Sequence, residues 1–305
     1  MAKIAVESAR AHGEGQTASR LLAAGDGWCV ADVTCCAGPH DRPFEEQHDD
    51  VCIAIVTAGS FQYRSSGGRE LMTPGSLLLG SPGQYFECGH EHGTGDRCIS
   101  FSYDERRFEE LAAETGLRNR SGRFSSLRVP PLREFSGVIA RAHAALNRST
   151  GARRQSTNHS TAGESEWEEM GVELAALALG LAGGTRNPGS LPSSEARVTR
   201  AVRMIEERPD GNHDLASLAR EARLSRYHFI RVFRQLTGLT PHQYVLRVRL
   251  RLAAARLILE PARVVDVALD SGFGDVSNFN HAFRAEFGAS PVSYRGNGRG
   301  KKNVE

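Results

Sequence analysis

The sequence lacks any apolar run close to the roughly 18 residues that a membrane-spanning helix needs. The first residues, from Met1 to Ser8, also lack the apolar core of a secretory signal. Cysteine is scarce, with six residues in the chain, and all six lie in its first third. Without a secretory signal, we expect these cysteines to be reduced thiols rather than a disulfide framework. These absences argue against a membrane partner and predict a cytoplasmic protein.

Lysine is also scarce, because arginine supplies almost all of the positive charge. From Ser194 to the end there are 19 basic and 12 acidic residues, a net charge of +7, whereas the part before Ser194 has a net charge of −5. A basic second part predicts that this part binds a polyanion. The guanidinium group pairs two oxygens at once, which suits phosphates and guanine edges. A genome that favours arginine is the alternative explanation for the arginine content.

With 305 residues, the chain is long enough for two domains. Its first third has the pattern of short β-strands, because Gly, Pro, Ser and Asp interrupt apolar or alternating runs at intervals of roughly 8–15 residues. The runs span residues 27–36, 51–57, 61–64, 76–80, 84–88 and 97–103. This spacing predicts an antiparallel sandwich or barrel.

Helical patterns follow the strands. Residues 105–115 form a short candidate helix, and residues 131–147 and 166–181 carry apolar side chains at spacings of three and four. The segment 149–163 is rich in Gly, Ser and Thr, which predicts a loop. The Gly-, Pro- and Ser-rich segment 183–194 is typical of an interdomain linker.

After this linker nearly the whole chain is predicted to be helical. The helices span residues 196–207, 215–222, 226–237, 241–259, 264–270 and 276–287, with Pro or Gly between them. Residues 229–244 repeat as residues 279–294 without a gap. The matching pairs are Phe229/Phe279, Phe233/Phe283, Arg234/Arg284, Gly238/Gly288, Pro241/Pro291 and Tyr244/Tyr294. Each copy follows an N-cap residue, Ser225 or Asp275, and a short helix with a tight turn. This is the helix-turn-helix arrangement.

The second helix of each unit has two different faces at 100° per residue. Phe229 and Phe233 in the first unit, like Phe279 and Phe283 in the second, must lie in a core. The outward residues offer groups that can read base edges in a major groove. They are Arg226, Tyr227, Ile230, Arg231 and Arg234, and in the second unit Val276, Ser277, Asn280, His281 and Arg284. One such face is equally typical of a solvated helix, but two copies on a basic domain favour DNA binding.

The helix predicted over residues 241–259 joins the two units. Its apolar residues recur at spacings of three and four, which predicts a single stripe that packs on both units. The stripe consists of Val245, Val248, Leu252, Ala255 and Leu259. Four arginines project from other faces, and we expect some of them to contact DNA phosphates. They are Arg247, Arg249, Arg251 and Arg256. A helix of this length measures about 28 Å, so the two units can read successive major-groove segments about 34 Å apart.

These residues resemble the AraC/XylS family of bacterial transcription regulators over about residues 195–295. Besides the two-unit layout, the resemblance rests on Gly272-Phe273, Asn278-Phe279, Phe283-Arg284, Phe287-Gly288 and Pro291-Val292-Ser293-Tyr294-Arg295. It implies a promoter-binding protein that usually activates transcription, with RNA polymerase as a partner. It also places the family's base-reading positions at Tyr227, Ile230, Arg231, Val276, Ser277, Asn280 and His281. The two apolar residues among them, Ile230 and Val276, would contact a thymine methyl group or contribute little.

The first domain resembles the cupin-like sensor barrel of that family, on residues 71–79 and the following Pro82-Gly83-Gln84. The implied fold is α+β in two domains: a cupin-like β-barrel with packed helices, and an all-α domain of two helix-turn-helix units joined by a long helix. The resemblance also implies an effector, either a small molecule or an ion, and a homodimer formed by the helical layer. The alternative is that these helices only cover the barrel. The expected segments are a barrel at 1–125, a helical layer at 126–182, the linker at 183–194, the DNA-binding domain at 195–297 and a disordered tail at 298–305.

One stretch of the barrel carries four side chains that can bind metals. They are Cys88, His90, His92 and Cys98. Thiolates together with imidazoles suit zinc or copper. Strand alternation puts Cys88 on the same side as Phe86, however, and free cysteines are often buried as small hydrophobic residues. We therefore expect structural cysteines, an exposed turn that carries the two histidines, and no cofactor.

The sequence thus predicts a transcription regulator and not an enzyme. Two alternatives stay open. One is a metal- or thiol-redox-responsive regulator of the same architecture. The other is a cupin-type enzyme fused to a DNA-binding module. Such an enzyme would need a complete metal triad or an acid/base pair. The metal ligands of a metal-binding cupin are incomplete here, since only His48 stands at the place of the first ligands, and Tyr85 and Phe86 stand where the later histidine is expected.

Overall fold

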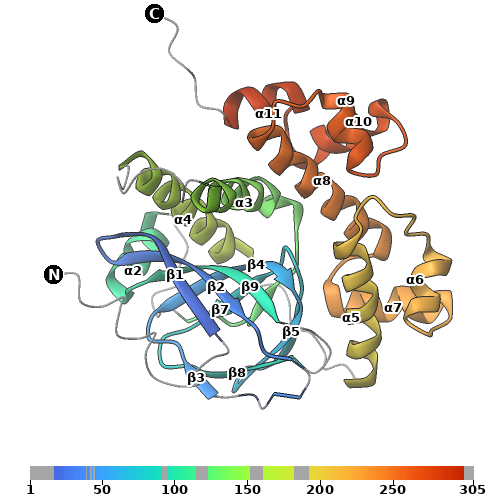
Figure 1. Cartoon of the computed structure of the whole chain (residues 1–305). Coiled ribbons are helices and arrows are strands. Elements are labelled where there is room, and N and C mark those ends of the chain that lie inside the picture. The colour runs from blue at the N-terminus through green and yellow to red at the C-terminus, as the bar shows by residue number, and fades with distance from the viewer. Residues whose placement is uncertain are drawn as a thin grey trace, which may run out of the picture.

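The computed structural model describes residues 17–38, 40–41, 43, 45–90, 95–114, 123–151, 161–181 and 192–298. A β-barrel covered by helical segments forms the first part, and a purely helical second part lies beside it (Figure 1). Among the described residues, no helix combines the length and the apolar character needed to cross a membrane. The predicted α+β architecture is confirmed.

The barrel is built from two antiparallel sheets. The larger has the strand order β1-β2-β9-β4-β7-β10 and the smaller the order β3-β8-β5-β6. The strands of the larger sheet are β1 (Thr17–Gly25), β2 (Trp28–Cys35), β4 (Val51–Gly59), β7 (Leu77–Gly80), β9 (Asp96–Tyr103) and β10 (Arg128–Val129). Those of the smaller are β3 (Glu45–Gln47), β5 (Phe61–Ser65), β6 (Gly68–Met72) and β8 (Tyr85–Gly89). All six predicted strands are present, whereas β1, β3, β6 and β10 were not predicted, because they are short or mostly exposed and lack an apolar pattern.

Strand β4 shows why the larger sheet has long apolar runs. Ile53 and Ile55 pack with the covering helices, whereas the alternate residues Cys52, Ala54 and Val56 pack inside the barrel. Both faces of the strand are therefore buried, so that the sequence reads as a continuous apolar run rather than an alternation.

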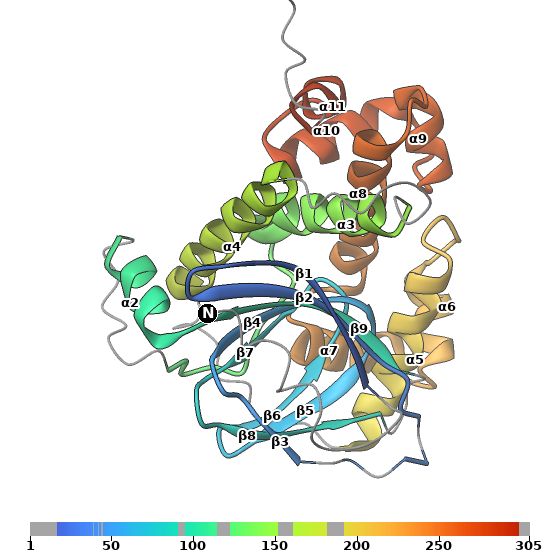
Figure 2. The same ribbon diagram turned by 60° about the vertical axis from the view of Figure 1, so that its left-hand side comes forward.

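Four helical segments cover the outer face of the larger sheet. They are α2 (Glu105–Glu114), the short 3₁₀ helix η2 (Arg133–Phe135), α3 (Ser136–Gly151) and α4 (Thr161–Leu181). The Trp167 ring of α4 lies 6.1 Å from that of Phe101, and the hydroxyl group of Tyr103 donates to the Gly171 carbonyl at 2.8 Å. Figure 2 shows α3 and α4 between the β1–β2 side of the barrel and the second part of the molecule.

The loop predicted over residues 149–163 is wrong at both ends. Helix α3 continues to Gly151 and α4 begins at Thr161, and residues 152–160 lie outside the described residues. Polar Ser and Thr are tolerated in the end turns of a helix, and Glu164 near the start of α4 complements its dipole. The local composition therefore led to an underestimate of the length of α3 and α4, whose middle turns are stabilised by packing.

The second part contains seven helices in its described residues. They are α5 (Pro192–Glu207), α6 (Leu215–Glu221), α7 (Arg226–Thr237), α8 (Pro241–Leu259), α9 (Val264–Asp270), α10 (Val276–Phe287) and α11 (Pro291–Gly298). The predicted N-caps are confirmed, since Ser225 and Asp275 each accept a hydrogen bond from an amide in the first turn of α7 or α10. Helix α11 was not predicted, and α5 begins inside the predicted linker, where Pro192 takes a first-turn position that suits proline. The rest of that linker up to residue 191 and the tail from residue 299 lie outside the described residues.

Helix α8 does not carry the single apolar stripe predicted for it. Its first half contributes Tyr244, Val245 and Val248 to the core of the first unit. Its second half contributes Leu250, Ala253, Ala254 and Leu257 to the core of the second unit, whereas Leu252 is 37% exposed. Two residues along a helix turn it by about 200°, so that Val248 and Leu250 face opposite ways. The two units thus pack on different sides of one helix.

Two glycines at the ends of the repeated helices offer a matched test of how the two parts contact each other. Gly238 after α7 (φ 80°) and Gly288 after α10 (φ 70°) both have left-handed backbone. A Cβ atom added at Gly238 would lie 2.5 Å from the Cβ of Pro130, whereas one at Gly288 would meet nothing within 4 Å. The turn after α7 therefore lies directly against the barrel part of the molecule.

We predict that Gly238→Ala lowers the free energy of unfolding more than Gly288→Ala does. Both substitutions cost roughly 1–2 kcal/mol because alanine disfavours a left-handed backbone. Gly238→Ala should cost about 1–3 kcal/mol more, since the added methyl group overpacks the contact with Pro130. Urea unfolding of both full-length variants measures the difference, and equal losses would contradict the close contact.

Candidate nucleic-acid interface and sensor site

Helix α7 presents the residues predicted to read DNA on one exposed face. Tyr227 is 80% exposed, and the other polar members of the set are exposed as well. They are Arg226, Arg231 and Arg234, and Ile230 is half-buried at the edge of the face. The opposite face is held by Phe229 and Phe233, whose rings lie 5.3 Å apart in the core of the first unit. The faces lie where the periodicity predicted them.

Helix α10 repeats this arrangement in the second unit. The exposed residues are Ser277, Asn280, His281 and Arg284, and Val276 is half-buried. Phe279 and Phe283 are fully buried on the other face, with ring centroids 5.4 Å apart. The molecule thus offers two helices whose outward faces carry donors and acceptors of the kind that read base edges.

The two units contact each other through Arg249. Its guanidinium group donates to the carbonyl oxygens of Pro209 and Gly211, both at 2.8 Å, in the loop before α6. The turn of the second unit lies against the same place, because a Cβ atom on Gly272 would be 2.7 Å from the Cα of Asp210. The relative position of α7 and α10 is therefore set by direct contact as well as by α8.

The other three arginines of α8 also bind protein atoms. Arg256 pairs with Glu260 and Asp270, both at 3.0 Å. Arg247 donates to the Pro131 carbonyl and pairs with Glu286 at 3.4 Å. Arg251 donates to the Pro74 carbonyl at 3.4 Å and pairs with Glu206 at 3.5 Å. These arginines therefore contact protein atoms in this structure, and their contacts with DNA phosphates stay a prediction.

A second interdomain contact lies at the start of the helical part. The carboxylate of Glu195 on α5 is 3% exposed and accepts hydrogen bonds from Gln62 of β5 and Arg69 of β6, each at 2.5 Å. The guanidinium group of Arg69 also donates to the side-chain oxygen of Gln62 at 2.5 Å. This polar cluster ties the smaller sheet of the barrel to α5, the first helix of the second part.

The barrel interior is filled by aromatic side chains and thiols. His48 stacks on Phe86 with ring centroids 4.2 Å apart and shares a 2.7 Å hydrogen bond with the hydroxyl group of Tyr63. Burial lowers the pKa of His48 to about 4, so this ring is neutral at pH 7. Cys88 and Cys98 border the same cluster, and burial raises the pKa of each thiol well above its usual value. Their protonated state fits the structural role expected for them.

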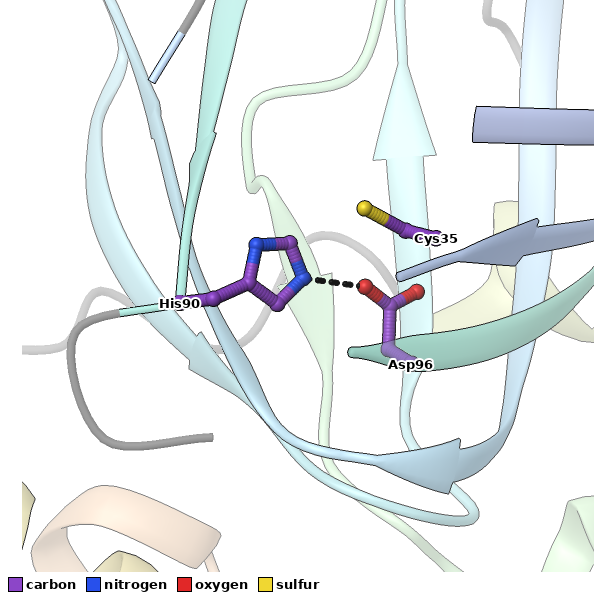
Figure 3. Close-up of side chains that lie close together, drawn as sticks. All are labelled: Cys35, His90 and Asp96. Carbon is purple, nitrogen blue, oxygen red and sulfur yellow. Dashed lines mark hydrogen bonds and ion pairs between the residues drawn. The ribbon is translucent and has the colours of Figure 1, made fainter. Parts of the chain in front are cut away.

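His90 lies with partners that the local spacing did not suggest. Its side chain is buried, and Nε2 lies 2.5 Å from Oδ2 of Asp96 (Figure 3). Burial alone would lower the pKa of His90, but hydrogen bonds to Asp96 and Cys35 and their charges outweigh it and raise the pKa to about 9. The prediction of an exposed His90 is therefore wrong, because its ring is buried beside the Asp96 carboxyl group and the Phe61 ring.

Cys35, His90 and Asp96 form the group of potential metal ligands among the described residues. One ligand atom from each lies within 4.8 Å of the other two. Of the four candidates from the sequence, only His90 belongs to this group; Cys88 and Cys98 belong to the barrel interior, and His92 lies outside the described residues. Figure 3 shows the three side chains coming from separate segments that meet at one end of the barrel.

Comparison with known proteins matches both halves of the chain. A model described as an AraC-like ligand binding domain matches residues 37–166, and one described as a helix-turn-helix domain matches residues 218–297. The regulator MtrA of Neisseria gonorrhoeae is 30% identical over 34% of this chain and 35% of its own length. The regulatory protein SoxS of Salmonella typhimurium is 29% identical over 34% of this chain and 96% of its own length.

A solved structure adds a direct comparison for the second half. The DNA-binding domain of AdpA, crystallised with a target DNA, is 31% identical over 35% of this chain and 96% of that domain, with a TM-score of 0.34. The chain spans about a third of the length of the first curated relatives that it matches. The chain thus combines an AraC-like ligand binding domain with a helix-turn-helix domain, as in the AraC/XylS family of transcription regulators, to which its homologues belong.

Proposed function

We propose that this protein regulates transcription by binding a specific DNA sequence with α7 and α10 and that an effector of the barrel domain controls this binding. The observation that carries the proposal is the duplicated exposed face: α7 and α10 hold their phenylalanine residues inward and their Arg, His, Asn, Ser and Tyr side chains outward. Contacts through Arg249 fix these two helices relative to each other. Such a pair suits two successive major-groove segments on one side of a duplex.

Effector control is supported by how closely the barrel domain contacts the DNA-binding half. Gln62 and Arg69 bind Glu195 of α5, and Ser136 at the start of α3 donates to Glu286 of α10. Helix α3 also packs along α8. A change in the barrel that alters these contacts would change the position of both units together, which gives the two sites a coupling free energy.

Activation, RNA polymerase contact and homodimer formation are parts of this proposal that rest on the family resemblance. The apolar stripe of α4 packs on the barrel, with Met170 and Leu174 fully buried. Helix α3 lies between α4 and α8. A homodimer would therefore use the remaining polar faces of this helical layer.

We predict that Arg231→Ala weakens binding to the natural DNA site and relaxes the base preference at the position that Arg231 reads. Loss of a bidentate base contact costs about 1–3 kcal/mol, or roughly 5- to 150-fold in affinity. Arg106→Ala is the matched control, because Arg106 is also an exposed arginine but lies on α2 of the barrel domain. Sites are first found by mapping bound DNA across the genome, and affinities are then measured by fluorescence anisotropy at fixed salt. Equal affinity of Arg231→Ala and the wild type would contradict the role of α7.

We predict that Glu195→Gln loosens the contact between the barrel and α5. The substitution keeps the size of the side chain but removes the charge that Arg69 pairs with, and hydrogen bonds to charged groups contribute about 1.5–3 kcal/mol. Amide hydrogen exchange should accelerate in β5, β6 and the first turns of α5. Glu207→Gln is the control, since Glu207 lies exposed at the other end of the same helix. Unchanged protection in Glu195→Gln would show that this contact does not hold the two parts together.

A cupin-type enzyme is the competing function, and the role of His48 argues against it. The one histidine at a metal-cupin position stacks on Phe86 and bonds to Tyr63, so that it packs the barrel interior. Regulation by a metal or a thiol is instead consistent with the residues at the end of the barrel.

A further inference from the structure

Three side chains with different ligand atoms converge at one end of the barrel. Cys35 is the last residue of β2 and Asp96 is the first residue of β9, and the antiparallel register pairs them directly. His90 follows the last residue of β8. Their sulfur, oxygen and nitrogen atoms all lie within 4.8 Å of one another. The position of this set is therefore fixed by two sheets and not by a single flexible loop.

The chemistry of this set suits a divalent transition metal ion. Zinc takes thiolate, imidazole and carboxylate ligands at about 2.0–2.3 Å, and sites with three protein ligands keep a fourth position open. Around a tetrahedral ion, ligand atoms at these bond lengths are about 3.3–3.8 Å apart. The three ligand atoms lie within 4.8 Å of one another, so side-chain rotations can bring them to these separations. The proton shared between His90 and Asp96 at 2.5 Å would be displaced, and the two atoms would move apart onto the metal.

We propose that Cys35, His90 and Asp96 bind a divalent transition metal ion, for which zinc is the best fit, and that this ion is an input of the barrel domain. The metal site is argued from the barrel alone, whereas the role of the ion as an input rests on the proposed regulatory function. The surroundings support a built site, because the side chains of His90 and Asp96 are only 2% and 7% exposed. The thiol of Cys98 donates to the second carboxylate oxygen of Asp96 at 3.5 Å, which orients that carboxylate.

A short series of contacts connects this site to the DNA-binding half. Gly89 precedes His90 and pairs with Gln62 across β8 and β5. The Gln62 side chain donates to Glu195 of α5 at 2.5 Å. The neighbouring Phe61 ring also stacks with the His90 ring, with centroids 5.9 Å apart. Rotation of His90 towards a metal would therefore displace the part of β5 that holds α5.

Metal binding is tested on the purified full-length protein, without DNA. Zinc affinity is measured by competition with a coloured chelator, and cobalt(II) is used as a spectroscopic substitute. We expect one ion per chain and a charge-transfer band from thiolate sulfur to cobalt. Cys35→Ser should abolish this band and lower the affinity by at least about 100-fold, the upper end of what loss of a supporting group costs. Cys36→Ser is the matched control, because Cys36 is the adjacent cysteine and is exposed.

His90→Ala and Asp96→Asn should lower the zinc affinity as well. Both also break a buried ion pair and can reduce folding, so circular dichroism accompanies each measurement, and Cys35→Ser, which leaves that pair intact, stays the deciding variant. A wild type that binds neither zinc nor cobalt, or a Cys35→Ser variant that binds them like the wild type, would overturn the site.

The regulatory half is tested by measuring DNA affinity with and without zinc. We expect zinc to change the affinity of the wild type by at least about fivefold, a typical allosteric coupling, and to have little effect on Gln62→Ala. If zinc binds but leaves the DNA affinity unchanged, the metal site stands and its role as an input of the barrel domain is overturned. A protein that binds zinc but no specific DNA in either state would instead overturn the proposed function.

Discussion

Helix α8 has to pack against three neighbours at once, and this constraint determines the arrangement of the molecule. Its first half completes the core of one helix-turn-helix unit, and its second half completes the core of the other. Between them, Arg247 and Arg251 reach carbonyl groups of the barrel domain. Because each neighbour takes a different side of the helix, α8 has no broad apolar face and its arginines are used inside the protein.

A consequence is that the barrel and the outward faces of α7 and α10 form one mechanically connected unit. Several contacts between the halves are polar and buried, as at Glu195 and at Tyr244, whose hydroxyl group donates to the Pro74 carbonyl at 3.5 Å. Buried polar groups cost about 1–3 kcal/mol when they lose a partner, so partial loss of such a network is unfavourable. A network of this kind favours two discrete arrangements over a gradual shift, which is what a regulator needs.

Much of the DNA-binding half could be predicted because its signals are local. The bounds predicted for α7, α8, α9 and α10 agree with those observed, since N-cap residues, glycines and prolines mark each end. The face of α8 could not be predicted in the same way. The 3-4 spacing of its apolar residues assumed one partner surface, and nothing local in the sequence indicates that the partner changes between Val248 and Leu250.

The cluster of Cys35, His90 and Asp96 at one end of the barrel was even harder to predict from the sequence. His90 could be identified as a potential ligand from its neighbours Cys88 and His92, but its observed partner Cys35 lies 55 positions earlier in the sequence. Strand register brings Cys35 opposite Asp96, and register depends on how the whole barrel closes. Pairing of β2 with β9 was not part of the prediction, so that Cys35 and Asp96 could not be recognised as members of one site.

Helices α7 and α10 of one chain have a fixed relative position that suits neighbouring major-groove segments on one side of a duplex. Hydroxyl-radical footprinting of the full-length protein on a natural site tests this most directly. We expect two protected segments on the same face of the DNA, centred about 10 base pairs apart, with both lost at the same protein concentration. A single protected segment, or two segments that are lost at different protein concentrations, would contradict it.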